Sequence, residues 1–297
     1  MSEGRIEFGM QLPIQSQSTI YAQPWERGAG PSELVQVARA CEAAGFDYVA
    51  VCDHVAIPAV QAEAMSTEWW DTIATLSYLA AVTERVRLLS HVYVLPYRHP
   101  LLAAKGWATL DALSRGRAIL GVGGGHVVGE FAALGVPYGE RGRLLDEAID
   151  AVRAALTEEF VSHKGEAWQF DDVGARPRPV QATLPIWVGG SSRPAMRRAA
   201  ERGDGWLPQG PPEGGMAAGI AFVRERRAAT RGDDPIVIGA LSGPLRMDSV
   251  DKVAGYLRTY RGMGCDQVQV GFVSRSAEDL CEQIARFATE VAPLVND

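Results

Sequence analysis

Short apolar runs alternate with helical patterns along the whole of this 297-residue chain, and that alternation restricts the possible folds more than any other feature. Repeated strand–helix units are typical of a parallel sheet covered by helices. Eight runs have the length and composition of buried strands. They are Ile6–Leu12, Tyr48–Cys52, Val86–Leu95, Ala118–Val122, Pro185–Val188, Gly205–Leu207, Ile236–Leu241 and Gln267–Phe272. Eight repeats favour a closed (β/α)8 TIM barrel of the α/β class over an open doubly wound sheet, which has about five or six strands.

The segments between the runs show apolar residues at helical spacing. The clearest stripes run from Leu34 to Cys41, from Leu145 to Leu156 and from Val250 to Tyr260. The segment from Asp171 to Leu184 holds two prolines, and we expect it to leave the barrel repeat. Since no segment has the composition of a linker, we predict a single barrel domain over residues 1–297, with insertions in the loops at its rim.

Composition excludes several classes of protein. The chain is 47% hydrophobic and 22% charged, which is close to the globular average, and its formal net charge is −7. That acidity argues against binding to nucleic acid or to an anionic membrane. The first seven residues lack the basic and apolar regions of a signal peptide, and no uncharged apolar run approaches the roughly 20 residues that span a bilayer. We therefore expect a cytoplasmic protein.

Cysteine and histidine spacings give no support for a metal site. The four cysteines form no C-x-x-C pair, and the five histidines form no H-x-x-x-H or H-E-x-x-H pair, so we predict no metal. Each cysteine lies in an apolar pattern and is expected to be a buried, reduced thiol.

The carboxyl ends of barrel strands are where catalytic residues gather, so the residues after each run are the first candidates. The second run leads into Asp53 and His54, and His54 is a candidate proton donor. A turn-capping aspartate beside an ordinary histidine is the alternative. The fourth run leads through a glycine-rich turn to His126. His126 stands where the dinucleotide-binding motif G-x-G-x-x-G requires its third glycine, so the turn is not that motif. His126 is predicted to share the rim with His54, in a catalytic or a pocket-lining role.

The fifth run ends in Gly189, Gly190, Ser191 and Ser192, directly before a helical segment. Glycines and hydroxyls at a helix start present N–H groups to an anion, and the helix dipole favours negative charge there. This pattern predicts a phosphate site, with an ordinary Ser192 N-cap as the alternative.

Long loops follow the first two runs and carry aromatic residues, namely Tyr21, Trp25, Trp69 and Trp70. Such residues either shape a pocket for an apolar substrate or only pack against neighbours.

Taken in order, these motifs resemble the luciferase-like monooxygenase superfamily, a (β/α)8 group that uses flavin mononucleotide (FMN) or the deazaflavin coenzyme F420. The resemblance is carried by Ser90–Lys105, Leu110–Gly123, Gly135–Gly142 and Pro185–Gly190, within a match over roughly Ile6 to Leu207.

The resemblance implies roles for several residues. In deazaflavin-using relatives the pair that corresponds to Asp53 and His54 lies beside the cofactor ring, with the histidine as proton donor. The relatives have a non-prolyl cis peptide in the third strand that supports the back of the ring, which implies such a bond at His91–Val92, or failing that at Ser90–His91. The resemblance also implies that Gly189, Gly190 and Ser191 contact the phosphate.

The function implied is an oxidoreductase that moves a hydride between C5 of F420 and a small organic substrate. One alternative is a monooxygenase that uses reduced FMN and O₂; another is a non-catalytic, flavin-binding member of the fold. Relatives often carry Glu or Trp at the position of His126, which leaves the second acid/base group open. Because relatives are commonly dimers, a homodimer is expected.

Overall fold

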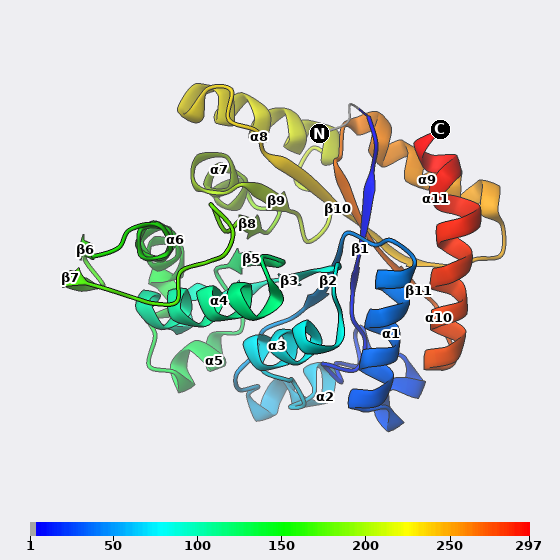
Figure 1. Ribbon diagram of the computed structural model, residues 1–297, viewed down its shortest axis with the longest axis horizontal. Coiled ribbons are helices and arrows are strands. Elements are labelled where there is room, and N and C mark those ends of the chain that lie inside the picture. Colours follow the sequence, from blue (N-terminus) through cyan, green and yellow to red (C-terminus); the bar gives the residue numbers. More distant parts are fainter. Residues whose placement is uncertain (1–3) are drawn as a thin grey trace.

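The computed structural model describes residues 4–297, and its centre is a closed barrel of eight parallel strands (Figure 1). The barrel strands are β1 (Glu7–Gln11), β2 (Tyr48–Val51), β3 (Arg87–Ser90), β5 (Ala118–Gly123), β8 (Ile186–Gly189), β9 (Gly205–Leu207), β10 (Val237–Leu245) and β11 (Gln267–Phe272). Pairing of Leu88 with Ala118 and of Leu89 with Ile119 joins β3 to β5 and closes the ring. The predicted fold class is confirmed.

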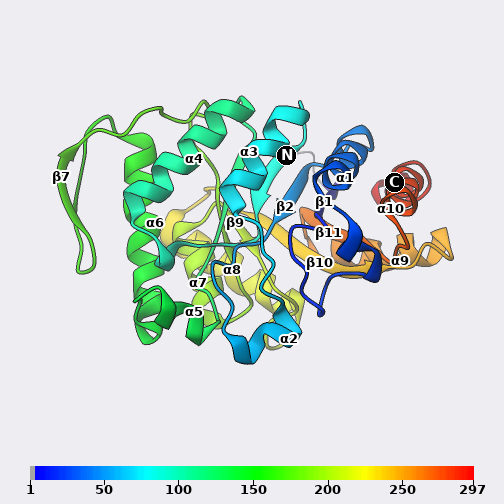
Figure 2. The same cartoon turned by 90° about the horizontal axis from the view of Figure 1, so that it is seen from below.

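Helices surround the barrel and follow its strands. The long helices are α1 (Pro31–Ala43), α3 (Thr72–Val82), α4 (Pro100–Ser114), α6 (Arg141–Thr157), α7 (Arg193–Arg202), α8 (Met216–Arg231), α9 (Val250–Met263) and α10 (Ala277–Arg286). Shorter helices are α2 (Ala62–Met65), α5 (Val128–Ala133) and α11 (Ala292–Asn296). Both views place α2 and α5 on the same side of the barrel, beyond the carboxyl ends of the strands (Figures 1 and 2). No helix within residues 4–297 combines the length and the hydropathy needed to cross a bilayer.

The third predicted strand, Val86–Leu95, is not continuous in the structure. It ends at Ser90 and resumes as β4 (Tyr93–Val94), which pairs with β5 through Tyr93 and Val122. The peptide bond between His91 and Val92 at the break is cis, as the resemblance implied.

The excursion from the barrel repeat begins earlier than predicted. An antiparallel hairpin of β6 (Val161–Lys164) and β7 (Gln169–Val173) projects from the barrel (Figure 2), and irregular chain follows it up to β8. The Glu147 carboxylate accepts hydrogen bonds from the N–H groups at positions 166, 167 and 168, which fixes the turn of the hairpin. The sequence prediction missed the hairpin because the prolines that drew attention to this region come after it.

The expectation that all four cysteines are buried, reduced thiols is confirmed only in part. All four are free thiols, but only Cys41 and Cys265 are buried, whereas Cys52 and Cys281 are half-buried. Cys52 lies beside a polar side chain, since the Gln11 Nε2 group is 2.9 Å from its Sγ atom.

A layer of large side chains fills the inside of the barrel. It consists of Tyr48, Ala50, Leu89, Ile119, Trp187 and Leu207. The Tyr48 and Trp187 rings meet edge to face with centroids 5.9 Å apart, and the Tyr48 ring occupies the space that a side chain at Gly9 would take. Because this layer is closely packed, it separates the carboxyl-terminal end of the barrel from the amino-terminal end.

Candidate active site

Asp53, directly after β2, is held by a network of internal contacts. Both carboxylate oxygens pair with the Arg98 guanidinium, at 2.6 and 2.7 Å. The Val94 N–H donates to Oδ2 at 2.8 Å and the Thr72 hydroxyl donates to Oδ1 at 3.1 Å. Burial acts to lower the pKa of Arg98, but the neighbouring Asp53 outweighs it and the pKa is raised. Asp53 is only 4% exposed, so it ties the end of β2 to β4 and sets the position of the next residue, His54.

His54 has one ring nitrogen committed to a carboxylate. Its Nδ1 lies 2.9 Å from Oε2 of Glu130. A carboxylate can only accept, so we assign the Nδ1 proton to this bond, which leaves Nε2 with no hydrogen bond to residues 4–297. The ring meets Trp69 edge to face with centroids 4.3 Å apart.

Glu130, on α5, is a candidate site residue that sequence reasoning missed. It is fully buried and also accepts hydrogen bonds from the Ala56 N–H at 3.1 Å, the Tyr97 hydroxyl at 2.9 Å and the Val55 N–H. Burial acts to raise its pKa, but the hydrogen bonds from His54 and from the Val55 and Ala56 backbone outweigh burial, and the net pKa is lowered. The carboxylate therefore stays ionised and gives His54 a fixed orientation. The only local signal was an acidic residue in an otherwise apolar turn between Val127 and Phe131.

His126 lies on the same rim as His54, with ring centroids 5.6 Å apart. Burial, followed by the nearby His54, lowers its pKa, and Glu130 acts in the opposite direction. A lowered pKa keeps the His126 imidazole neutral at pH 7, so it can accept or donate a hydrogen bond at the mouth.

The loops after β1 and β2 pair with each other over this rim. Ser16 and Trp69 form an antiparallel bridge. The Trp70 N–H donates to the Gln15 carbonyl at 2.9 Å, and the Gln17 N–H donates to the Glu68 carbonyl at 3.1 Å. The pairing holds the Trp69 ring against His54. Exposed apolar side chains extend along the same loops, among them Ile20, Tyr21 and Val60.

The break in the third strand builds a cradle between three strands. Val92 methyl groups occupy the positions that side chains at Gly123 and Gly189 would take, so β5 and β8 approach the break closely. His91 is 4% exposed, with Nδ1 2.9 Å from Oε1 of Gln269. Its Nε2 atom is buried and has no partner among the described residues. Burial lowers the pKa of His91, although the Gln269 contact opposes it, so the imidazole is neutral at pH 7.

The glycine–serine turn after β8 is partly used by the fold itself. The Gly190 N–H donates to the Leu207 carbonyl at 2.9 Å, and the Ser191 hydroxyl donates to the Gly210 carbonyl at 2.6 Å. The Ser192 hydroxyl accepts from the Ala195 N–H at 3.4 Å, so Ser192 is the N-cap of α7. Within residues 4–297, the N–H groups of Ser191 and Ser192 donate to no protein atom, which leaves them for an anion at the helix start.

Comparison with known proteins identifies the family. Residues 6–276 match the model of the luciferase-like monooxygenases. The chain belongs to this family. Members of this family are flavin- or F420-dependent oxidoreductases and monooxygenases.

Individual relatives and solved structures are similar to the chain over most of its length. The chain is 32% identical to the uncharacterized protein Rv0953c of Mycobacterium tuberculosis, over 90% of this chain and 95% of the relative. Its fold is shared with the monooxygenase RslO1 from Streptomyces bottropensis, at a TM-score of 0.79 and 21% identity, covering 97% and 99% of the two chains. It is also shared with an F420-dependent secondary alcohol dehydrogenase, at a TM-score of 0.74 and 15% identity, covering 99% and 100%.

Proposed function

We propose that this protein is an oxidoreductase that moves a hydride between C5 of F420 and a small organic substrate, with His54 moving the accompanying proton. The observation that carries the proposal is the contact between His54 Nδ1 and the buried Glu130 carboxylate. It leaves Nε2 as the ring nitrogen that can exchange a proton with a substrate.

The residues at the mouth fit a planar cofactor with a phosphate tail. The cradle around Val92 offers an apolar surface for the back of a ring, and the unpartnered His91 Nε2 offers a hydrogen-bond acceptor to its edge. The free N–H groups of Ser191 and Ser192 and the dipole of α7 suit a phosphate. Bound F420 would supply hydride transfer at C5.

Several protein side chains then have separate roles in the proton transfer. When an alcohol is oxidised, its hydroxyl proton passes to Nε2 of His54, and the reverse transfer accompanies reduction of a carbonyl. The Glu130 carboxylate stabilises the imidazolium, and the Tyr97 hydroxyl holds that carboxylate in place. Trp69 covers one side of His54 and limits its contact with water. His126 is close enough to contact the same substrate, and Asp53 fixes the turn that carries His54.

The proposal is tested by titrating the purified protein with F420 and, separately, with FMN, following fluorescence of each cofactor. We expect micromolar binding of F420 and negligible binding of FMN. The reverse preference, with oxygen uptake on adding reduced FMN and a substrate, would replace the proposal with an FMN-dependent monooxygenase. Tight F420 binding without turnover of any alcohol or carbonyl compound would indicate a non-catalytic member.

Two variants test the proposed roles. His54→Ala should lower turnover by about 10²–10⁴-fold with little change in cofactor affinity, whereas His163→Ala, in the distant hairpin, should leave turnover unchanged. Ser192→Asp should weaken cofactor binding at least about tenfold through charge repulsion, while retaining the N-cap. Ser192→Asn is its neutral control.

The expected homodimer is part of the proposal and is tested by sedimentation equilibrium.

A further inference from the structure

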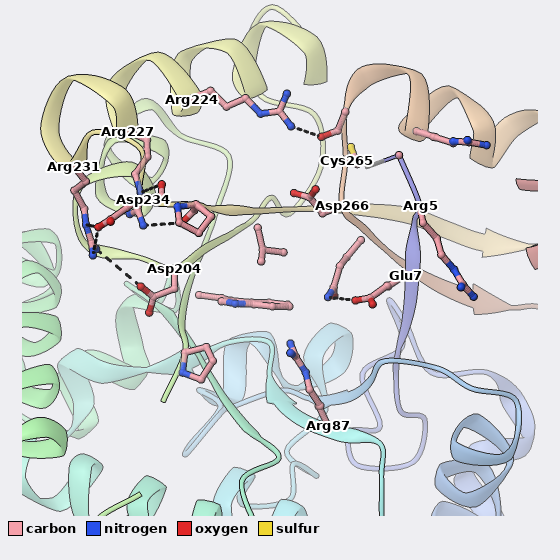
Figure 3. Close-up of a pocket in the computed structure, with 18 residues that line it drawn as sticks. Arg5, Glu7, Arg87, Asp204, Arg224, Arg227, Arg231, Asp234, Cys265 and Asp266 are labelled. Atoms are coloured by element: carbon pink, nitrogen blue, oxygen red, sulfur yellow. Dashed lines mark hydrogen bonds and ion pairs between the residues drawn. The ribbon is translucent and has the colours of Figure 1, made fainter. Parts of the chain in front are cut away.

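A cavity lies at the amino-terminal end of the barrel, opposite the candidate active site (Figure 3). Its volume is about 570 Å³, within the range of small-molecule sites, which is about 300–1,000 Å³. The first residues of β1, β3 and β11, namely Glu7, Arg87 and Gln267, line it, and the closely packed Trp187 is also part of its wall. Neither His54 nor any other residue of the candidate active site contributes to it.

Two buried polar atoms in this cavity have no partner among the described residues. Gln267 is 3% exposed, and its Nε2 group donates to Asp47 Oδ2 at 2.8 Å and to Glu7 Oε2 at 3.2 Å. Its Oε1 atom accepts nothing. The Arg87 Nε atom is likewise buried without an acceptor, although an Nη atom of the same side chain lies 3.5 Å from Asp47. Each such atom costs about 1–3 kcal/mol if it stays unsatisfied, so a polar group that pairs with either atom would be stabilised there.

Three arginines around the cavity form no ion pair with a carboxylate of the described residues. Arg227 is 4% exposed and donates only to backbone carbonyls, such as that of Gly203 at 2.6 Å. Arg224 donates to the Gly264 carbonyl and Arg261 to the Val295 carbonyl, each at 2.8 Å. Within residues 4–297 none of these three forms an ion pair. Figure 3 shows Arg224 reaching across the top of the cavity. Arg227 is used by these backbone contacts, whereas Arg224 and Arg261 each donate one hydrogen bond to the described residues and keep other N–H groups for an anion.

The wall contains six arginines but only four acidic residues. Glu7 and Asp266 line the cavity, and burial raises the pKa of both, although Arg87 opposes the effect on Glu7 and the Ile238 N–H opposes it on Asp266. A carboxyl with a raised pKa takes up a proton more readily when an anion enters. Asp234 is paired with Arg231 at 3.1 Å, so that pair is already neutral.

We propose that this cavity binds a small organic anion that also carries a hydroxyl group. The acid group would contact Arg224 and Arg261, and hydroxyl groups suit the two buried atoms, because a hydroxyl can donate to Gln267 Oε1 and accept from Arg87 Nε. Hydroxycarboxylates and sugar phosphates share this chemistry.

The experiment uses isothermal titration calorimetry on the full chain without cofactor, so its outcome does not depend on the proposed redox function. Citrate and glucose 6-phosphate represent the two sources, and inorganic phosphate and glucose are the controls that carry only one of the two groups. We expect citrate or glucose 6-phosphate to bind with a Kd below about 1 mM, at least about tenfold tighter than either control.

Substitutions inside and outside the cavity test whether the anion binds there. Arg224→Met should weaken binding of the better ligand at least about tenfold, whereas Arg226→Met, on the same helix but outside the cavity, should leave it unchanged. Arg87→Met should remove the preference for a hydroxylated anion over phosphate. Three results would each overturn the proposal: no binding of either hydroxylated anion at millimolar concentration, equal binding of phosphate, or equal weakening by Arg226→Met.

Discussion

At the carboxyl-terminal end of the barrel, Asp53 and Glu130 are buried among donors that satisfy their oxygen atoms, whereas at the amino-terminal end Gln267 and Arg87 each keep a buried atom without a partner. The two ends share one barrel and similar residue types, so sequence composition does not explain the difference. Internal pairing at the first end fixes side chains in a preorganised geometry, which chemistry requires. Incomplete pairing of Gln267 and Arg87 within the described residues, as of His91 Nε2 at the first end, leaves hydrogen bonds for a ligand to complete.

The largest effect is expected from breaking the Asp53–Arg98 pair. Arg98→Met leaves a buried carboxylate without its countercharge and should lower the free energy of unfolding by about 3–5 kcal/mol. Urea denaturation measures it. A loss below about 1 kcal/mol would contradict the view that this end depends on internal pairing.

Glu130→Gln should have the next largest effect. It should lower the free energy of unfolding by about 1–3 kcal/mol at pH 7, because it removes a charged acceptor from a buried network. The loss should depend on pH. Since the folded-state pKa of Glu130 is lowered, its stabilisation is present above the ordinary glutamate value of 4.5 and disappears as pH falls through the lowered pKa. Denaturation of both proteins between pH 7 and acid pH should therefore show a shrinking difference; a constant difference would contradict an ionic role.

Arg224→Met, the matched change at the other end, should alter the free energy of unfolding by less than about 1 kcal/mol, because within residues 4–297 Arg224 has one backbone hydrogen bond and no ion pair. The same urea series measures it. A loss as large as that of Arg98→Met would show that both ends rely on pairing alike.

The smallest effect, a few tenths of a kcal/mol, is expected for Glu7→Gln, and its sign is the informative part. Burial and the nearby Asp47 raise the pKa of Glu7 above 4.5, so the ionised carboxylate destabilises the fold above that raised pKa, and the penalty fades as pH falls through it. The stability of Glu7→Gln relative to the wild type should therefore increase with pH, whereas that of Glu130→Gln should decrease.

The barrel could be predicted from the sequence because its strands and helices leave periodic patterns that depend only on neighbouring residues. The hairpin of β6 and β7 left no such pattern, because its turn depends on Glu147, which lies on a preceding helix. The break after Ser90 was predicted from the family resemblance and not from periodicity.

The candidate site was predictable where it follows strand ends. Asp53, His54 and His126 are examples. Glu130 and Tyr97 were missed because their roles arise only when three loops that are distant in sequence meet at His54. The cavity around Gln267 was missed for a different reason: charged residues before a strand have the same sequence pattern as solvated loop residues.

The pairing of the two rim loops also governs how the mouth moves. Backbone hydrogen bonds of Gln17 and Trp70 join the loops on either side of the Ser16–Trp69 bridge, so one loop cannot swing away while the other stays in place. We therefore expect any opening to be a single cooperative fluctuation of both loops, which would uncover His54 as Trp69 leaves. The same fluctuation frees the amide protons of Gln17 and Trp70, so their hydrogen-exchange rates measure how often the mouth is open.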